Sequence, residues 1–268
     1  MSELVGDCSI RQLNASFIIH RSLSLSLSLS GKTTLALEIL LNQDEWISPP
    51  GFDFYFWALP EGATPPEAVV NGPLPFQIIR GIPDGASLPE RALVCIDDLQ
   101  SEQNTNLVLL FTVHSHHKHI SVLNLTHSLF PKNRFQRDLT QSTKYIFAKK
   151  SPRDVQAFHR LAVQLEPGGA RNLYDAYREA TKAPFGHFLV DLTQDIHPAL
   201  RFRSVHQLPG GGGQATCIYA HDTDVDDLMK TETQYGKYDP SAPHSSTSSL
   251  VHGESSATQS SAGHSVEE

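Results

Sequence analysis

Two separate groups of residues have the types and spacing needed to bind a nucleoside triphosphate together with Mg²⁺. Gly31-Lys32-Thr33-Thr34 opens an apolar stretch, and it has the form in which a phosphate-binding loop enters a helix. Lys32 would place its charge on the β- and γ-phosphates, the Thr33 hydroxyl would bind Mg²⁺, and the helix N-terminus would offer free N–H groups to the anion. We therefore expect ATP and Mg²⁺ as ligands, with these four residues contacting the nucleotide.

The second group consists of acids at the end of an apolar run. Residues 92–98 read Ala-Leu-Val-Cys-Ile-Asp-Asp, about 60 residues after the lysine. A strand here would carry Asp97 to the edge of a sheet, where it could hold the hydration shell of Mg²⁺, and Asp98 could act as general base on an attacking water. Apolar strands also end in Asp at simple turns, but the pairing with Gly-Lys-Thr favours a Walker B motif. A third apolar run, 120–127, ends in His127, which could sense the γ-phosphate.

The segment before Gly31 departs from the expected pattern. The form G-x-x-x-x-G-K-[ST] requires glycine at position 26, whereas Ser26 lies within the Ser-Leu alternation of residues 22–30. Alternation with period two is typical of a half-buried strand, but a two-letter repeat carries little structural information. We interpret the run as a low-complexity insertion, and our hypothesis is that a repeat expansion or a gene-model error replaced a glycine-rich loop. If the run is genuine, weak nucleotide affinity and little turnover are expected, and sequencing the transcript tests its origin.

The elements needed to position these groups follow from the apolar pattern. The order of motifs predicts an α/β fold of the P-loop NTPase type, in the subclass with an additional strand between the two motif strands (ASCE-type), with a mostly parallel sheet flanked by helices. Residues 187–192 and 200–205 are expected to pair as an edge hairpin. The remaining expected strands are 15–20, 53–59, 75–84, 92–98, 120–127 and 143–148, and the expected later helices are 152–165 and 172–182.

Composition divides the 268 residues into two regions. The chain carries a net charge of −8, and residues 208–268 hold nine acidic against two basic residues. We expect an ATPase domain at 1–207 and a mostly disordered, acidic, Ser/Gly-rich tail at 208–268. Three dispersed cysteines favour a reducing intracellular compartment. Neither a secretory signal nor an apolar run long enough to cross a membrane is evident, so a soluble protein is expected.

Two clusters of basic or metal-binding residue types allow more than one interpretation. His114-Ser-His-His-Lys-His119 suggests zinc, but it lacks a Cys pair, and a surface or intersubunit loop is favoured. Residues 132–160 carry eight basic and two acidic side chains, which could contact DNA phosphates, reach a neighbouring subunit's ATP, or form a solvated face. Arg134, Arg137 and Arg153 are the candidates for an arginine finger or for DNA contacts.

The order of motifs resembles the poxvirus-type genome-packaging ATPases of the FtsK/HerA superfamily, in the version found in Maverick/Polinton elements. This resemblance implies a ring-shaped homo-oligomer that hydrolyses ATP to drive double-stranded DNA into a capsid, with capsid proteins as further partners, in the nucleus or at the site of virion assembly. It assigns Lys32 and Thr33 to Walker A and Asp97 and Asp98 to Walker B, and it places His127 where the family usually has glutamine. The motifs are Gly31-Lys-Thr-Thr-Leu, Gly81-Ile-Pro-Asp, Ile96-Asp-Asp-Leu, Phe111-Thr, Ser115-His-His, Ile120-Ser-Val-Leu, Leu129-Phe, Ser151-Pro-Arg-Asp and Pro184-Phe-Gly-His-Phe-Leu-Val-Asp-Leu.

Two other functions compete with an ATP-driven translocase. The first is a catalytically inactive remnant that binds nucleic acid or protein through the basic stretch. The second is a P-loop small-molecule kinase, which is disfavoured because no lid-like arginine cluster is evident. Hydrolysis of ATP that is stimulated by DNA separates the translocase from the remnant.

Overall fold

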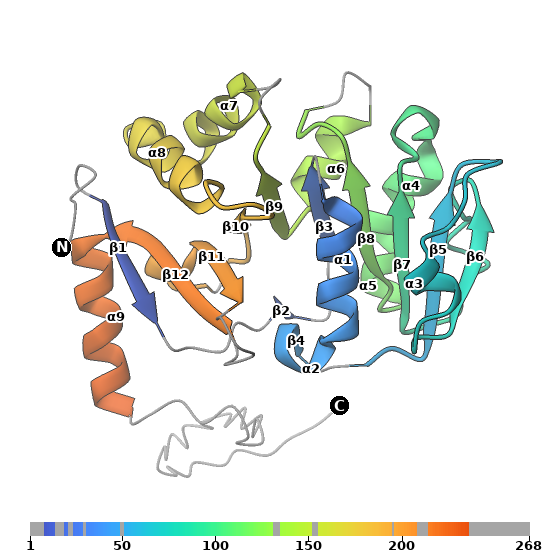
Figure 1. Ribbon diagram of the computed structural model, residues 1–268, viewed down its shortest axis with the longest axis horizontal. Helices are drawn as coiled ribbons and strands as arrows, with labels where there is room; N and C mark the ends of the chain where they lie inside the picture. Colours follow the sequence, from blue (N-terminus) through green and yellow to red (C-terminus); the bar gives the residue numbers. More distant parts are fainter. Residues whose placement is uncertain are drawn as a thin grey trace, which may run out of the picture.

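A computed structural model describes most of the chain between Cys8 and Tyr235 (Figure 1). The described residues are 8–13, 19–20, 24–28, 31–48, 51–130, 135–151, 155–194, 196–207 and 214–235. In this part of the chain, no helix is long and apolar enough to cross a membrane.

A ten-stranded sheet of order β1-β12-β11-β10-β9-β3-β8-β7-β5-β6 forms the centre of the molecule. A separate two-stranded sheet joins β2 and β4. The strands are β1 Cys8–Leu13, β2 Ile19–His20, β3 Ser24–Ser28, β4 Ile47–Ser48, β5 Phe54–Leu59, β6 Phe76–Arg80, β7 Ala92–Asp97, β8 Ser121–Thr126, β9 Tyr145–Lys149, β10 His187–Asp191, β11 Phe202–Gln207 and β12 Gln214–His221.

The half of the sheet from β9 to β6 is entirely parallel. Four of its strands, β5, β7, β8 and β9, are almost entirely buried, as expected of strands covered by helices on both faces. The strand β8 lies between β3, which precedes Gly31, and β7, which ends in Asp97. This order confirms the predicted fold class with an additional strand between the two motif strands.

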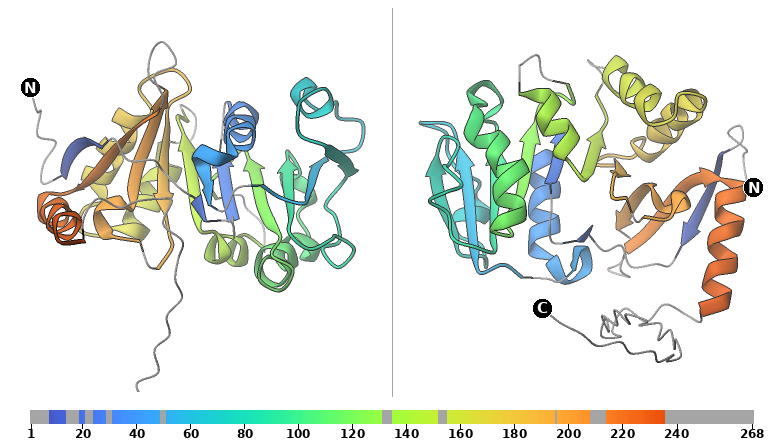
Figure 2. Two further views of the ribbon diagram at one scale, coloured as in Figure 1. Left: turned by 90° about the horizontal axis from the view of Figure 1, so that it is seen from below. Right: turned by 180° about the vertical axis from the view of Figure 1, so that it is seen from behind.

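Helices cover both faces of the parallel half (Figures 1 and 2). On one face, α1 and α2 pack on the apolar side chains of β5, β7, β8 and β9. On the other face, α4, η2 and α6 cover β5, β7 and β8, whereas α7 and α8 cover β9, β10 and β11. The helices are α1 Lys32–Leu41, α2 Gln43–Trp46, α3 Glu67–Val70, η1 Gln100–Glu102, α4 Thr105–Leu109, η2 Leu110–His114, α5 Ser115–His117, α6 Gln136–Ser142, α7 Val155–Leu165, α8 Ala170–Ala180, η3 Pro198–Leu200 and α9 Asp222–Tyr235.

The Ser-Leu run does not form an insertion beside the sheet in the part that is described. Residues 24–28 form β3, which pairs in parallel with β8 on one side and β9 on the other. The strand expected at 15–20 is described only at Ile19–His20, which pairs with β4 outside the main sheet. The run was interpreted as an insertion, but residues 24–28 form a strand because two neighbouring strands complete its hydrogen-bond ladder.

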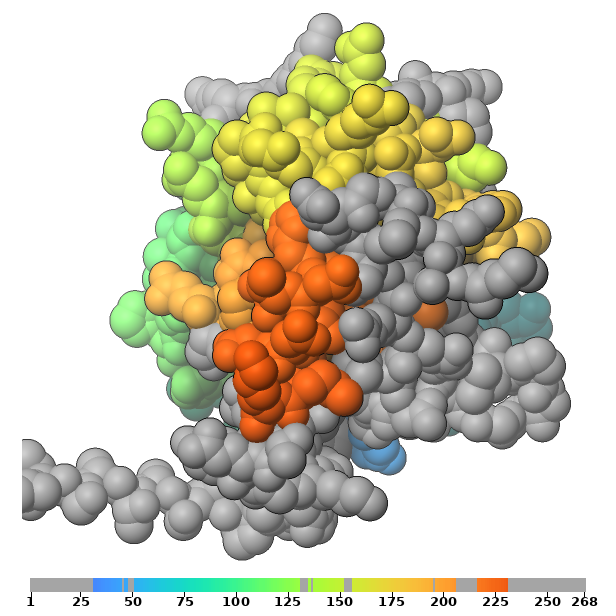
Figure 3. All heavy atoms as spheres, turned by 90° about the vertical axis from the view of Figure 1, so that its left-hand side faces the viewer, coloured from blue at the N-terminus to red at the C-terminus, as the bar shows by residue number. Residues whose placement is uncertain are grey.

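The region expected to be a disordered tail contains two ordered elements. Strand β12 pairs with β11 and with β1, and α9 packs on it through Val225 and Leu228, which are 1% and 8% exposed. Figure 3 shows α9 in orange on this side of the molecule, next to the yellow helices α7 and α8. Asp222, Asp226 and Asp227 of α9 are exposed, whereas Ile218 and Tyr219 of β12 are buried. The predicted disorder is corrected for 214–235, and residues 208–213 and 236–268 lie outside the described part.

The predicted hairpin of β10 and β11 forms, but it does not lie at the edge of the sheet. The two strands are antiparallel, with Leu189 opposite Arg203. Because β12 and then β1 add to β11, the hairpin becomes an interior part of the sheet. The edge position was predicted only because β12 was assigned to a tail.

The histidine-rich segment is helical from His114 to His117, whereas Lys118 and His119 lie in the loop before β8. Residues 110–114 form η2, and Ser115–His117 continue it as α5. His116, His117 and His119 are exposed, and no group of three or more potential metal ligands occurs among the described residues. Lys118 stabilises the loop that precedes β7, since its Nζ donates to the carbonyls of Gly85, Ala86 and Leu88 at 3.2, 2.6 and 2.9 Å.

Candidate nucleotide site

Three parallel strands direct a polar side chain toward the start of α1. Alternate residues of a strand lie on the same face, so the residue two positions after a buried α1-facing side chain continues that row. The rows that pack with α1 are Leu93 and Cys95 in β7, Leu123 and Leu125 in β8, and Tyr145 and Phe147 in β9. The residues that extend these three rows at the C-terminal ends of the strands are Asp97, His127 and Lys149.

The N-terminus of α1 begins at the same edge. Gly31 has φ 77° and ψ 19°, a left-handed conformation that glycine adopts without steric cost. Its carbonyl accepts the first helical hydrogen bond from Leu35 at 3.1 Å. The following side chain, Lys32, is only 7% exposed. Thr33 is half-buried and Thr34 is exposed.

Lys32, His127 and Asp98 form a chain of polar contacts. The Nζ of Lys32 lies 3.0 Å from Nδ1 and 3.4 Å from Nε2 of His127, and Nε2 of His127 lies 2.6 Å from Oδ1 of Asp98. An ammonium can only donate, so Lys32 donates to Nδ1 and the Nε2–H of His127 donates to Asp98. The backbone N–H of His127 donates to Oε1 of Gln100 at 2.9 Å, which fixes the turn after β8.

Burial and neighbouring charges shift the pKa values of two groups in the site, the Lys32 ammonium and the Asp97 carboxylate. Burial lowers the pKa of Lys32, and the carboxylates of Asp98 and Asp97 oppose that shift. Burial raises the pKa of Asp97, and Lys32 is the largest opposing influence, with the indole of Trp57 second. The Nε1–H of Trp57 has no partner within hydrogen-bond distance among the described residues, so the indole acts on Asp97 as a nearby dipole. Lys32, Asp97 and Asp98 therefore lie close enough to influence one another electrostatically.

The raised pKa of Asp97 predicts a pH-dependent effect of replacing it. Between the ordinary pKa and the raised one, the folded state retains a proton that the unfolded state has released, so this group lowers stability as pH rises through that interval. We expect Asp97→Asn to gain stability relative to the wild type as pH increases from about 4 to 7. Urea unfolding of both proteins across this range measures the difference. A difference that stays constant, or that shrinks as pH rises, would contradict the raised pKa.

The donor types suit a magnesium triphosphate. Lys32 and the N–H groups at the start of α1 can bind phosphate oxygens, and the Thr33 hydroxyl and Asp97 carboxylate are oxygen ligands of the kind that Mg²⁺ takes. The loop before the helix fits less well. β3 continues through position 26, opposite Asn124 and Ile146, to Ser28, so only residues 29–31 separate the strand from α1. Backbone groups of 25–28 that pair with both neighbouring strands are not available to surround a phosphate.

Lys149 is a site residue that the sequence analysis did not single out. It was counted with the surface-charged stretch 132–160, yet it is 3% exposed. A Cβ built on Gly31 would lie 3.0 Å from its Nζ, so the ammonium is beside the start of α1. The signal was present in the sequence, because Lys149 continues the period-two row of Tyr145 and Phe147.

The arginine candidates are not brought to this site among the described residues. Arg137 is exposed on α6, and within the described part of the chain no hydrogen bond or ion pair joins it to Lys32, Asp97 or His127. Arg134 and Arg153 lie outside the described residues.

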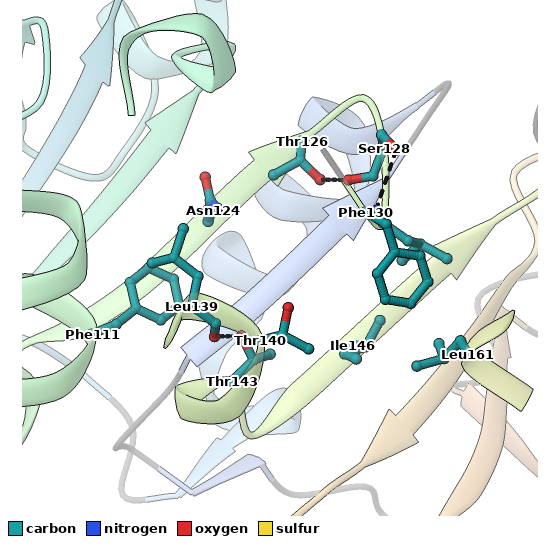
Figure 4. A pocket seen from close by; sticks show the side chains of 11 residues that line it. Phe111, Asn124, Thr126, Ser128, Phe130, Leu139, Thr140, Thr143, Ile146 and Leu161 are labelled. Carbon is teal, nitrogen blue, oxygen red and sulfur yellow. Dashed lines mark hydrogen bonds between the residues drawn. The ribbon is translucent and has the colours of Figure 1, made fainter. Parts of the chain in front are cut away.

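A small pocket lies beside β8, on the other face of the sheet from α1 (Figure 4). Its lining includes Asn124 and Thr126, which alternate with the α1-facing residues Leu123 and Leu125. Thr126 Oγ1 donates to the carbonyl of Ser128 at 2.9 Å, as Figure 4 shows. The pocket is therefore distinct from the edge at which Lys32 and Asp98 meet.

The strand order, the glycine–lysine–threonine helix start and the acids at the end of β7 define an α/β fold of the P-loop NTPase type, with β8 as the additional strand. No family model and no curated protein sequence matches the chain. Among solved structures, the chain is similar to the genome packaging NTPase B204 from Sulfolobus turreted icosahedral virus 2, in complex with sulfate. The identity is 9% and the TM-score 0.40, over 66% of this chain and 91% of the viral protein.

Proposed function

We propose that this protein is an ATP-binding and ATP-hydrolysing motor that moves double-stranded DNA into a viral capsid, encoded by an integrated element of the Maverick/Polinton type within the FtsK/HerA superfamily. The observation that carries the ATPase part is the meeting of Lys32, His127 and Asp98 at the carboxyl edge of the parallel strands. In open α/β sheets, ligands bind at this edge. The DNA-packaging part is supported by the order of motifs along the sequence.

Each residue has a role that follows from its place. Lys32 binds the phosphates, Asp98 holds the attacking water as general base, and His127 lies where it can respond to the γ-phosphate. Thr33 and Asp97 would hold Mg²⁺, which when bound supplies charge neutralisation at the phosphates. A bound triphosphate competes with His127 for the Lys32 ammonium, since both need the same donors. Occupation of the site is thereby linked to the contact between His127 and Asp98.

The DNA-contacting surface is narrower than the sequence stretch 132–160 indicated. Lys149 is buried, so it does not contribute to an exposed basic face. The exposed basic residues of this stretch within the described part are Arg137, Lys150 and Arg160. In a ring of identical subunits, Arg134, Arg137 or Arg153 would supply the arginine finger, and mixing each arginine variant with wild-type subunits identifies it.

The proposal is tested by ATP hydrolysis of the purified protein with and without double-stranded DNA. We expect Mg²⁺-dependent phosphate release that DNA increases severalfold and that falls with salt, because contacts to phosphates release counterions. Replacing Lys150 and Arg160 together by glutamine should remove most of the stimulation and leave DNA-independent turnover unchanged. Turnover that is present but indifferent to DNA would argue against a translocase.

One observation favours a second candidate, a remnant that does not hydrolyse ATP and binds nucleic acid or protein. β3 extends to Ser28 and takes up backbone that a glycine-rich loop would leave free for phosphate. The remnant predicts DNA binding by gel shift together with phosphate release no faster than in a Lys32→Ala variant. Measurable turnover that depends on Lys32 would exclude it.

A further inference from the structure

Lys149 is a buried cation placed directly beside the start of α1. It is the last residue of β9, and it is only 3% exposed. The carbonyl of Lys149 accepts a hydrogen bond from the Tyr177 hydroxyl at 2.9 Å, which fixes the end of the strand. A Cβ on Gly31 would lie 3.0 Å from Lys149 Nζ and 3.3 Å from Cδ1 of Phe185. The ammonium therefore lies against the backbone of the phosphate-binding segment.

The charge of Lys149 is not neutralised by an ion pair within the described residues. Its Nζ donates to the carbonyl of Phe185 at 3.2 Å and lies 5.8 Å from the centre of that ring. The carboxylate of Glu38 in α1 acts against the lowering of the Lys149 pKa, and no carboxylate of the described residues lies within 4.0 Å of the Lys149 Nζ. Burial lowers the pKa of Lys149, and Glu38 offsets this only in part. A buried ammonium without a paired anion costs stability, so its retention needs another reason.

Phe185, whose carbonyl accepts the hydrogen bond from Lys149, has an unfavourable backbone conformation. Phe185 has φ 63° and is 74% exposed, although aromatic residues rarely adopt left-handed backbone angles. Its carbonyl is the one that Lys149 contacts, and its ring lies against Gly31. Strained backbone of this kind concentrates at ligand-binding sites. The backbone angle of Phe185 is a separate observation from the burial of Lys149, and both features lie beside Gly31.

The strand order places Lys149 on one side of β3 and His127, which contacts Lys32, on the other side. β3, which leads into Gly31, lies between β8 and β9. The turn after β8 carries His127, the partner of Lys32, whereas Lys149 ends β9. Gly31 thus has the Lys149 ammonium beside it on the β9 side, whereas the Lys32 ammonium contacts His127 on the β8 side.

We propose that Lys149 is a second phosphate-binding cation of this site, which together with Lys32 binds the polyphosphate of a nucleoside triphosphate in place of the missing glycine-rich loop. The inference rests on the proposed function for the identity of the nucleotide. The recognition of a polyphosphate by two buried lysines does not depend on hydrolysis or on DNA.

Binding of tripolyphosphate and of ATP to the full-length protein, measured by isothermal titration calorimetry, tests the inference. Lys149→Met keeps an unbranched side chain of similar length and removes the charge, and Lys150→Met is the matched control at the adjacent exposed lysine. We expect Lys149→Met to weaken tripolyphosphate binding by about 10- to 100-fold, as removal of a charge-assisted contact does, and Lys150→Met to change it less than about threefold. Equal binding by Lys149→Met and wild type would overturn the inference.

Thermal unfolding without ligand separates a binding role from a structural one. A lysine kept for binding imposes a cost on the free protein, so Lys149→Met should melt at the wild-type temperature or above it. A clearly lower melting temperature with unchanged affinity would show that Lys149 is structural. Should the variant not fold, the pKa of the Lys149 ammonium in the wild type, followed by NMR of its Cε, should rise when tripolyphosphate is added. An unchanged pKa would overturn the inference.

The failure of this inference and that of the proposed function give different results. If the wild type binds ATP and Lys149→Met binds it equally well, only the inference fails. If tripolyphosphate binds through Lys149 but ATP is neither bound more tightly nor hydrolysed, the inference stands and the ATPase proposal fails. If the wild type binds neither ligand, both fail.

Discussion

Replacement of Lys32 by alanine is expected to lower ATP turnover by at least about 100-fold, the loss typical of removing one preorganised group that stabilises transition-state charge. Lys32 is 7% exposed, and its contact at 3.0 Å is with Nδ1 of the His127 ring. An incoming γ-phosphate offers this ammonium a much stronger partner than imidazole does. Phosphate release under saturating ATP and Mg²⁺, together with equilibrium ATP binding, measures the effect.

The matched control for this substitution is Lys150→Ala, which removes an exposed lysine of the same charge. It should hydrolyse ATP at the wild-type rate in the absence of DNA. The folded state of Lys32→Ala should persist, since burial already lowers the pKa of Lys32 and its removal relieves that cost. A folded Lys32→Ala protein with wild-type turnover would show that the chemistry occurs elsewhere.

Replacement of Asp191 by alanine is expected to reduce the free energy of unfolding by about 3–5 kcal/mol, because it leaves a buried guanidinium without its carboxylate. Oδ2 of Asp191 lies 2.6 Å from NH2 of Arg203, and the two side chains are 3% and 7% exposed. Burial lowers the pKa of Arg203 to about 10 even with Asp191 beside it, so the cation is strongly desolvated. Oδ1 of Asp191 also accepts from the N–H and Oγ1 of Thr193, at 3.1 and 2.6 Å. Urea unfolding followed by circular dichroism gives the difference.

An exposed ion pair serves as the control for this prediction. Arg91 and Asp53 are 2.7 Å apart, but both side chains are 50% exposed. Asp53→Ala should cost less than about 1 kcal/mol, since water solvates both charges. The double variant Asp191→Leu with Arg203→Met should recover much of the lost stability, because apolar residues of similar size replace the pair. Similar costs for Asp191→Ala and Asp53→Ala would show that burial does not decide the strength of these pairs.

The convergence of Lys32, Asp98 and His127 could be predicted from the sequence because each follows, within two residues, the end of an apolar strand or begins the helix after one. Parallel strands end at one edge of a sheet, so local patterns sufficed to bring these residues together. Lys149 could have been found in the same way. Its charge assigned it to a surface stretch instead, although its place in the alternation with Tyr145 and Phe147 indicated burial.

The amino-acid sequence alone determined the class of the fold, because hydrophobic periodicity and motif spacing are local properties of the chain, and it indicated which residues would lie at the carboxyl edge of the strands. Only the tertiary structure decided that residues 24–28 form the strand before the helix, that 214–235 complete the sheet, and that Lys149 lies beside Gly31. A Ser-Leu repeat or an acidic segment becomes ordered only when neighbouring strands supply its hydrogen bonds and cover its apolar face. Those neighbours are distant in the chain, so no local pattern specifies them.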